Sequence, residues 1–253
     1  MPNKSVEAII LQVQLYGEAD LIIDFFSSQS GRMRGMAKGA KKSKKRFVHC
    51  LEPLNWVRLH LFEKQNVSLV RIDQGELIDP FPGIRKDFKK WGQAGFFCEM
   101  IKELFGVGDP NPAVFELIRE SLKVLEQEKR DQEVFSIYQI RLFKLAGYAF
   151  HLTSCLSCGK KAEEIQNPIF SPVRGGVICP SCHKGENGIR LSPGAVRSIH
   201  QSMHMSLPQV FRIRFTREIR GEIEGLLKSF SSYIIGKELG SARYLKQLQE
   251  AYG

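Results

Sequence analysis

The hydrophobic period of this chain changes once, near residue 80, and that change constrains the fold more than any other feature. Before it, short runs of alternating apolar or β-branched residues are separated by turn residues, which is typical of strands. Five strands are predicted: Val6–Leu15, Leu21–Phe26, Arg32–Ala37, Leu51–Phe62 and Val67–Ile72. The polar break Glu63–Asn66 indicates a hairpin turn between the last two. Five strands in about seventy residues predict a small barrel.

Beyond Asp79–Gly83, apolar residues recur at helical spacing. The first helix is expected to carry the apolar residues from Trp91 to Phe105 and to end at the break Gly106–Pro110. Residues that accept hydrogen bonds from free backbone N–H groups mark the starts of later helices. These signals are Asn111–Pro112, Asp131, Ser192–Pro193 and Thr216. Gly147 is predicted to end the third helix, because glycine adopts the left-handed conformation readily.

A cysteine-rich segment lies between Gly147 and Ser192 and interrupts the helical region. The predicted fold is therefore a multidomain α+β protein, with an N-terminal β-barrel and an α-helical domain that carries an inserted four-cysteine module. A chain of 253 residues is long enough for such an arrangement.

The inserted segment has a C-x2-C-x20-C-x2-C pattern, formed by Cys155, Cys158, Cys179 and Cys182. Each close pair can bind one edge of a tetrahedron, so the spacing favours one Zn²⁺ ion over four reduced thiols. Four thiolates leave no position for a reactive water, which indicates a structural metal. His183 follows the last cysteine but is not counted as a ligand. The remaining Cys50 and Cys98 are interpreted as structural.

A dense group of cations follows the third predicted strand, with eight in fifteen positions and no acidic residue among them. The candidate nucleic-acid contacts are Arg32, Arg34, Lys38, Lys41, Lys42, Lys44, Lys45 and Arg46. Together with a formal net charge of +10, this density favours a polyanionic partner. A solvated loop or a localisation signal is the alternative. Phe47, Trp56 and Phe62 are available as base platforms, although core packing is the favoured interpretation of each.

Other signatures of activity are missing from the sequence. It has no phosphate-binding loop, no nucleophile elbow and no compact acidic cluster, so we expect no enzyme. His200 and His204 have helical spacing but lack the adjacent glutamate of zinc proteases. The chain also shows no signal peptide and no membrane span, which predicts a soluble, cytoplasmic protein without a membrane partner.

Several separate segments resemble the RecO family of bacterial recombination mediators. They are Glu7–Leu11, Tyr16–Asp20, Gly35–Ala40, Leu145–Tyr148 and Ser241–Leu245. The resemblance implies an OB-fold nucleic-acid-binding domain over residues 1–80 and a helical domain over 81–150 and 191–253. It also implies a zinc module over 151–190.

The resemblance further implies function. A RecO-like protein binds single- and double-stranded DNA, anneals complementary strands without ATP, and contacts the C-terminal tail of single-stranded DNA-binding protein. It also joins RecR and thereby assists RecA indirectly, in the cytoplasm and at the nucleoid. We hypothesise that Arg141 and Lys144 contact the acidic tail.

Two other classes of function are considered. A zinc-ribbon RNA-binding or ribosome-associated protein would also combine a barrel with a basic loop, and competition between RNA and DNA would distinguish it. A metal-dependent nuclease would need an open metal site or clustered carboxylates, which the sequence does not supply.

Overall fold

The computed structural model describes residues 3–62, 69–127, 131–185 and 187–252. Its contacts divide the chain into two compact units, which we call the first unit (Met1–Gln127 with Leu239–Gly253) and the second unit (Glu128–Glu238). The four-segment division predicted above, with boundaries at 80, 150 and 190, stays a prediction.

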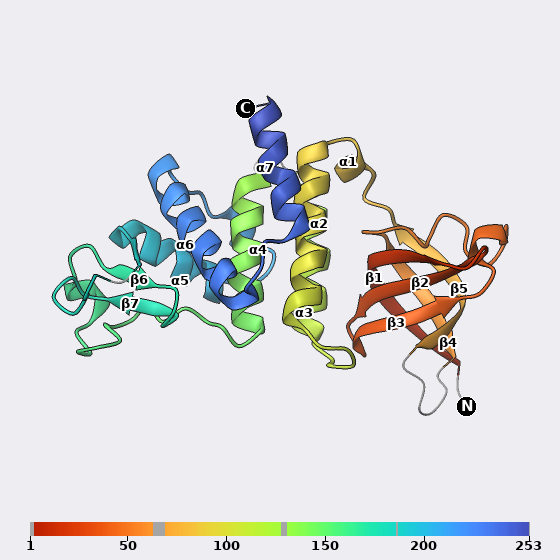
Figure 1. Cartoon of the computed structure of the whole chain (residues 1–253), viewed down its shortest axis with the longest axis horizontal. Coiled ribbons are helices and arrows are strands. Elements are labelled where there is room, and N and C mark those ends of the chain that lie inside the picture. The colour runs from red at the N-terminus through yellow and green to blue at the C-terminus, as the bar shows by residue number, and fades with distance from the viewer. Residues whose placement is uncertain (1–2, 63–68, 128–130, 186, 253) are drawn as a thin grey trace. The chain divides into compact units, whose positions relative to one another are not determined.

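The N-terminal part is a closed five-stranded barrel with the strand order β1-β2-β3-β5-β4 (Figure 1). The strands are β1 Asn3–Tyr16, β2 Asp20–Ser27, β3 Gly31–Ala37, β4 Trp56–Phe62 and β5 Val70–Asp79. All neighbours pair antiparallel except β3 and β5, which pair parallel. This arrangement confirms an OB-like barrel. Its interior is filled by buried aliphatic and aromatic side chains that include Ile10, Ile23, Phe25, Leu59 and Ile72.

Two strand boundaries differ from the prediction by five residues or more, and β1 begins three residues before the predicted Val6. β4 begins at Trp56 rather than Leu51, because Asn55 closes a turn by donating from its side-chain amide to the carbonyls of His49 (2.9 Å) and Cys50 (3.1 Å). β5 continues past Ile72 to Asp79, since β4 supplies hydrogen-bonding partners along this polar stretch. The predicted strand start at Val67 and the turn Glu63–Asn66 lie outside the described residues.

Helices α1 Pro82–Arg85, α2 Phe88–Leu104, α3 Pro112–Gln127 and α7 Gly240–Tyr252 complete the first unit. The short α1 was not predicted. Figure 1 shows α7 beside α2, and Gly92 makes this approach possible, because an added Cβ would lie 2.7 Å from Leu245 Cδ2. Glu99 accepts hydrogen bonds from the backbone N–H groups of Gly240 (3.0 Å) and Ser241 (2.9 Å) at the start of α7. The last helix of the chain therefore packs with the helices that follow the barrel.

The second unit contains α4 Asp131–Leu145, α5 Pro193–His204 and α6 Arg217–Ile235. Between α4 and α5 lie a three-stranded sheet and a 3₁₀ turn, and η3 Gln209–Arg212 precedes α6. The sheet has the order β7-β6-β8, with β6 Ile169–Ser171, β7 Gly176–Ile178 and β8 Ile189–Arg190. The 3₁₀ turn is η2 Ala162–Glu164. We call residues 151–190 the cysteine module; its insertion between helices confirms the predicted fold class.

Three predicted helix starts and one predicted helix end agree with the structure, whereas capping by Asp131 stays a prediction. Asn111, Ser192 and Thr216 each accept a hydrogen bond from a first-turn backbone N–H, at 3.2, 3.2 and 3.3 Å. Asp131 is the first residue of α4, and Gly147 has a φ of 87° just beyond its end. Local residue chemistry thus sets where these helices begin and end.

Candidate nucleic-acid surface and metal centre

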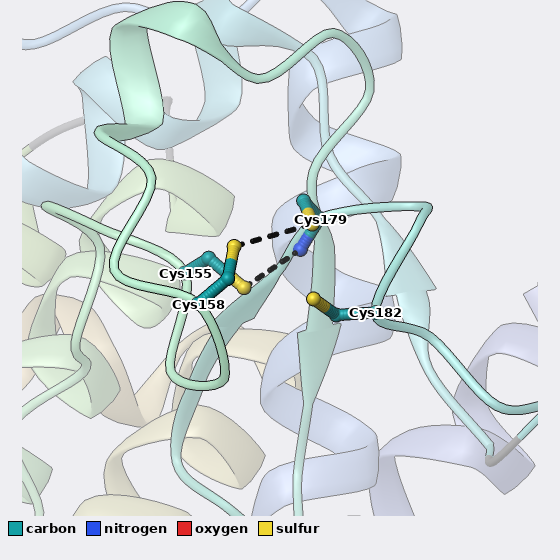
Figure 2. Close-up of side chains that lie close together, drawn as sticks. All are labelled: Cys155, Cys158, Cys179 and Cys182. Carbon is teal, nitrogen blue, oxygen red and sulfur yellow. Dashed lines mark hydrogen bonds between the residues drawn. The ribbon is translucent and has the colours of Figure 1, made fainter.

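The four predicted metal ligands converge. The Sγ atoms of Cys155, Cys158, Cys179 and Cys182 all lie within 4.8 Å of one another (Figure 2). Cys158 Sγ and Cys179 Sγ are 3.8 Å apart. A tetrahedral zinc site with Zn–S bonds of about 2.3 Å has sulfur–sulfur edges of about 3.8 Å. The cluster therefore has dimensions suited to a metal ion of this kind.

Tight turns bring each pair of thiols together. The N–H of Gly159 donates to the carbonyl of Cys155 (2.9 Å), and the N–H of Cys182 donates to that of Cys179 (3.0 Å). The Cys155 sulfur accepts from the N–H groups of Cys179 (3.3 Å) and Ser157 (3.4 Å); Figure 2 marks the first of these bonds. Backbone N–H groups aimed at sulfur stabilise a thiolate.

The thiols differ in how readily they ionise. Burial disfavours the Cys155 thiolate, but the N–H groups of Cys179, Cys158 and Ser157 outweigh it and lower the pKa to about 6. The neighbouring sulfurs of Cys179 and Cys158 raise the pKa of Cys182 to about 12. Four negative sulfurs at this separation repel one another, so a cation is needed to hold all of them as thiolates.

The cysteine module is joined to the helices of the second unit by an aromatic cluster. Phe230 of α6 packs edge-on against Phe143 of α4 and Phe150, with both ring-centroid separations at 5.0 Å. Phe150 in turn packs on Phe170 of β6 at 5.5 Å. The module therefore shares a core with the helices that flank it.

The residues Lys38–Arg46, which we call the basic loop, are fixed through their backbone. The N–H of Gly39 donates to the Asp20 carboxylate (2.7 Å), and the N–H of Lys41 donates to the carbonyl of Ala19 (3.1 Å). Ala19 lies in the turn between β1 and β2, and Asp20 is the first residue of β2. These two bonds therefore hold the loop to one end of the barrel without using its lysine ammonium groups.

The lysine side chains of the basic loop project into solvent. Lys38, Lys41, Lys42, Lys44 and Lys45 are all exposed. In the described part of the chain, no carboxylate pairs with any of their ammonium groups. Five cations close in sequence and free of acidic partners create a strongly positive surface.

Arg46 differs from these lysines. Its guanidinium donates to the carbonyl of Lys38 (2.6 Å) and lies 5.0 Å from the centre of the Phe47 ring. Its own carbonyl accepts from the N–H of Gly75 in β5 (2.9 Å). Arg46 is exposed, but it closes the basic loop and links it to the barrel.

The two arginines of β3 share a strand face but have different surroundings. Both line a polar hollow of about 200 Å³ on the outer face of β1, β2 and β3, together with Gln12, Gln14 and Asp24. Arg34 is exposed. Arg32 is paired with Asp24 at 2.7 Å and donates to the carbonyl of Lys102 (2.7 Å). Its charge is thus already used to join the barrel to α2.

Arg141 and Lys144, the candidate partner contacts, belong to α4, and their side chains reach the carboxyl end of α5. Arg141 donates to the carbonyls of Ser202 (3.0 Å) and Met205 (2.6 Å). Lys144 donates to that of Met203 (2.8 Å). They satisfy carbonyls that a helix end leaves unpaired and complement its dipole.

The three aromatic residues considered as base platforms are not open rings. Phe47 is only 6% exposed. The Trp56 ring is covered by Arg119 (5.5 Å) and Lys123 (5.3 Å), and Phe62 is half-buried. The favoured interpretation of Phe47 as a core residue is confirmed.

Known protein families match nearly the whole chain. A family model described as the recombination protein O N terminus matches residues 1–81, and one described as the recombination protein O C terminus matches residues 85–243. The chain belongs to the RecO family. A DNA repair protein RecO from Syntrophobacter fumaroxidans is 33% identical over 98% of each chain. Another from Desulfatibacillum aliphaticivorans is 32% identical over the full length of both.

The two RecO regions divide the candidate sites between them. The N-terminal region contains the barrel and the basic loop, and the C-terminal region contains α2 to α6 and all four cysteines. Membership of RecO assigns the chain to DNA repair and recombination. No helix among the described residues is long and apolar enough to cross a membrane.

One exposed ring of this RecO chain was not among the predicted site residues. Tyr16 ends β1 and is 53% exposed, beside the turn that anchors the basic loop. In the sequence, Tyr16 stands out only as the first residue of the RecO-like segment Tyr16–Asp20. The signal that could have identified it is an aromatic residue directly before a glycine turn, in a barrel that also carries a basic run.

Proposed function

We propose that this RecO-family chain binds single- and double-stranded DNA through the basic loop and anneals complementary strands without nucleotide hydrolysis. The observation that carries the proposal is the contrast within the loop: its backbone is anchored, while its lysines are exposed and have no acidic partner among the described residues. A preorganised row of ammonium groups can hold phosphates without reading sequence.

Annealing requires two polyanions to approach each other. Lys38, Lys41, Lys42, Lys44 and Lys45 neutralise phosphates and release counterions, which lowers the repulsion between strands. Base pairing supplies the free energy, so no phosphate-binding loop is needed. Arg34 adds a cation on the outer barrel face, whereas Arg32 positions the barrel and Arg46 shapes the loop.

The metal in this proposal is structural Zn²⁺. Cys155, Cys158, Cys179 and Cys182 would hold it, and the ion would cross-link the two tight turns of the cysteine module. The size of the thiol cluster and the hydrogen bonds to the Cys155 sulfur support this assignment.

The partners belong to the same proposal. Family membership supports a RecR complex that assists RecA, and contact with the acidic tail of single-stranded DNA-binding protein. The side chains of Arg141, Lys144, His200 and His204 group at the end of α5. Burial and the charges of the other three lower the pKa of His204.

Arg141→Glu should weaken binding of a labelled tail peptide, whereas Arg197→Glu, on an exposed part of α5, should not. Unchanged affinity in Arg141→Glu would remove this residue from the tail site.

The main test is strand annealing over a salt series. A variant with Lys41, Lys42, Lys44 and Lys45 changed to alanine should lose annealing. Its salt dependence of single-strand binding should fall by up to about 2.8 units of log K per log[salt], at roughly 0.7 per phosphate contact. The matched control changes the exposed Lys86, Lys160, Lys161 and Lys228, which removes equal charge elsewhere.

The outcomes separate the alternatives. Wild-type protein that anneals nothing would refute the proposed function. Equal losses in both lysine variants would mean that net charge, not the basic loop, drives binding. Stronger competition by matched RNA than by DNA would instead favour an RNA-binding protein.

A further inference from the structure

Phosphate contacts cannot make a protein prefer unpaired DNA, because both strands of a duplex carry phosphates. Proteins that select single strands add aromatic side chains on which exposed bases stack. Phe47 and Trp56 are buried or covered, so neither offers a free ring face to a base. Among the described Phe, Trp and Tyr residues near the basic loop, Tyr16 remains open.

The Tyr16 side chain is 53% exposed, and Leu15 beside it is 67% exposed. Within the described residues, no hydrogen bond, ion pair or ring contact involves the Tyr16 side chain. Its ring therefore contributes little to the barrel core and is available to a ligand.

Backbone pairing fixes Tyr16 close to the cations. Its Cα pairs with that of Asp20 across β1 and β2. The Asp20 carboxylate accepts from the N–H of Gly39, and the intervening turn accepts from the N–H of Lys41. The ring and the start of the basic loop therefore occupy the same end of the barrel, held by two hydrogen bonds.

Tyr16 also continues the outer face of the barrel. Alternate residues of a strand share a face, so Gln12, Gln14 and Tyr16 follow one another there. Gln12 and Gln14 line the polar hollow that Arg34 borders on β3. A strand of DNA lying across this face would pass from an arginine to an aromatic ring and then to lysines.

We propose that Tyr16 stacks on an unpaired base of a DNA strand whose phosphates are held by Arg34, Lys38 and Lys41. This inference rests on the proposed function and deepens it, because a stacked base would add affinity for single strands that duplex DNA does not share. The flat phenol ring can stack on any base, since every base has a π-face, so this contact does not depend on the DNA sequence.

The test compares three ligands: a single-stranded oligonucleotide, the same backbone with abasic sites, and the matching duplex. Tyr16→Ala should lower affinity for the intact single strand roughly tenfold or more. It should leave abasic and duplex affinity and the salt dependence unchanged, because the lysines remain. Tyr16→Phe should keep wild-type affinity, whereas Tyr16→Leu, apolar but not flat, should behave like alanine.

Phe88→Ala is the matched control, since Phe88 is 72% exposed in the same unit but lies at the start of α2. It should bind all three ligands as wild type does. Circular dichroism on each variant checks that the barrel is intact.

The results keep the two proposals apart. If wild-type protein binds none of the three ligands, the proposed function fails. If wild type binds and the loop lysine variant does not, but Tyr16→Ala equals wild type, the stacking inference is wrong and the proposed function stands. An equal loss of intact and abasic strands in Tyr16→Ala would also overturn stacking.

Discussion

The basic loop and the cysteine module are both short, loop-rich segments, but they are fixed in opposite ways. In the basic loop, backbone N–H groups bind the β1–β2 turn and the lysine side chains stay free. In the cysteine module, side chains converge on one point and backbone N–H groups serve the sulfurs. Side chains that are not needed for folding are available for binding, whereas side chains that converge on one point hold the fold together.

The largest expected effect is therefore a single change in the cysteine module. Cys179→Ala removes one sulfur from the cluster and should abolish zinc binding. Because structural zinc contributes about 10–16 kcal/mol of binding free energy in zinc-finger peptides at pH 7, the second unit should unfold at a much lower temperature. Elemental analysis and calorimetry measure both quantities.

Cys98→Ala is the control for that experiment. Cys98 is buried in α2 of the first unit, so the change creates a small cavity but leaves the metal ligands untouched. This variant should retain one zinc ion per chain. If Cys179→Ala also retained one, the four-thiolate site would be incorrect.

The next largest effect on stability concerns two cations whose side chains, like those of the cysteines, make contacts within the fold. Arg141→Met removes two hydrogen bonds to the end of α5 and should lower the free energy of unfolding by about 1–3 kcal/mol. Lys144→Met removes one bond from an exposed side chain and should cost less, about 0.5–1 kcal/mol. Urea unfolding gives both values. No loss in Arg141→Met would mean that its carbonyl contacts are not stabilising.

The comparison also explains which features the sequence could predict. Each close cysteine pair and each helix cap depends on residues within a few positions of each other, such as Cys155 with Cys158 or Ser192 with Ala195. The strands were predictable because a half-buried strand imposes a period of two. All these signals are local.

What could not be predicted depends on partners far along the chain. Arg32 and Arg34 look alike in sequence, yet within the described ranges only Arg32 meets a carboxylate and the carbonyl of Lys102, seventy residues later. The acceptors of Arg141 lie 61 and 64 residues away. The packing of α7 against Gly92 is likewise invisible before folding.

A smaller effect concerns the anchor of the basic loop. Asp20→Ala removes the carboxylate that accepts from the N–H of Gly39 and should lower stability by about 1 kcal/mol. The loop should become less ordered, so affinity for single-stranded DNA should also fall by a few-fold. Glu18→Ala removes the same charge from an exposed position in the same turn and should change neither. Equal behaviour of the two variants would show that charge, rather than anchoring, is responsible.

The smallest expected effect on stability is also the sharpest test of whether the basic loop is held by its backbone while its lysine side chains stay free. Replacing Lys41, Lys42, Lys44 and Lys45 by alanine removes four charges, yet none of these side chains has an acidic partner among the described residues. Surface changes away from packing and hydrogen bonds usually alter stability by no more than about 0.5 kcal/mol, and relief of like-charge repulsion acts against any loss. Thermal unfolding should therefore match wild type while DNA binding is lost. A loss of stability as large as that of Asp20→Ala would mean that the lysines help to hold the loop, and the distinction between an anchored backbone and free side chains would fail.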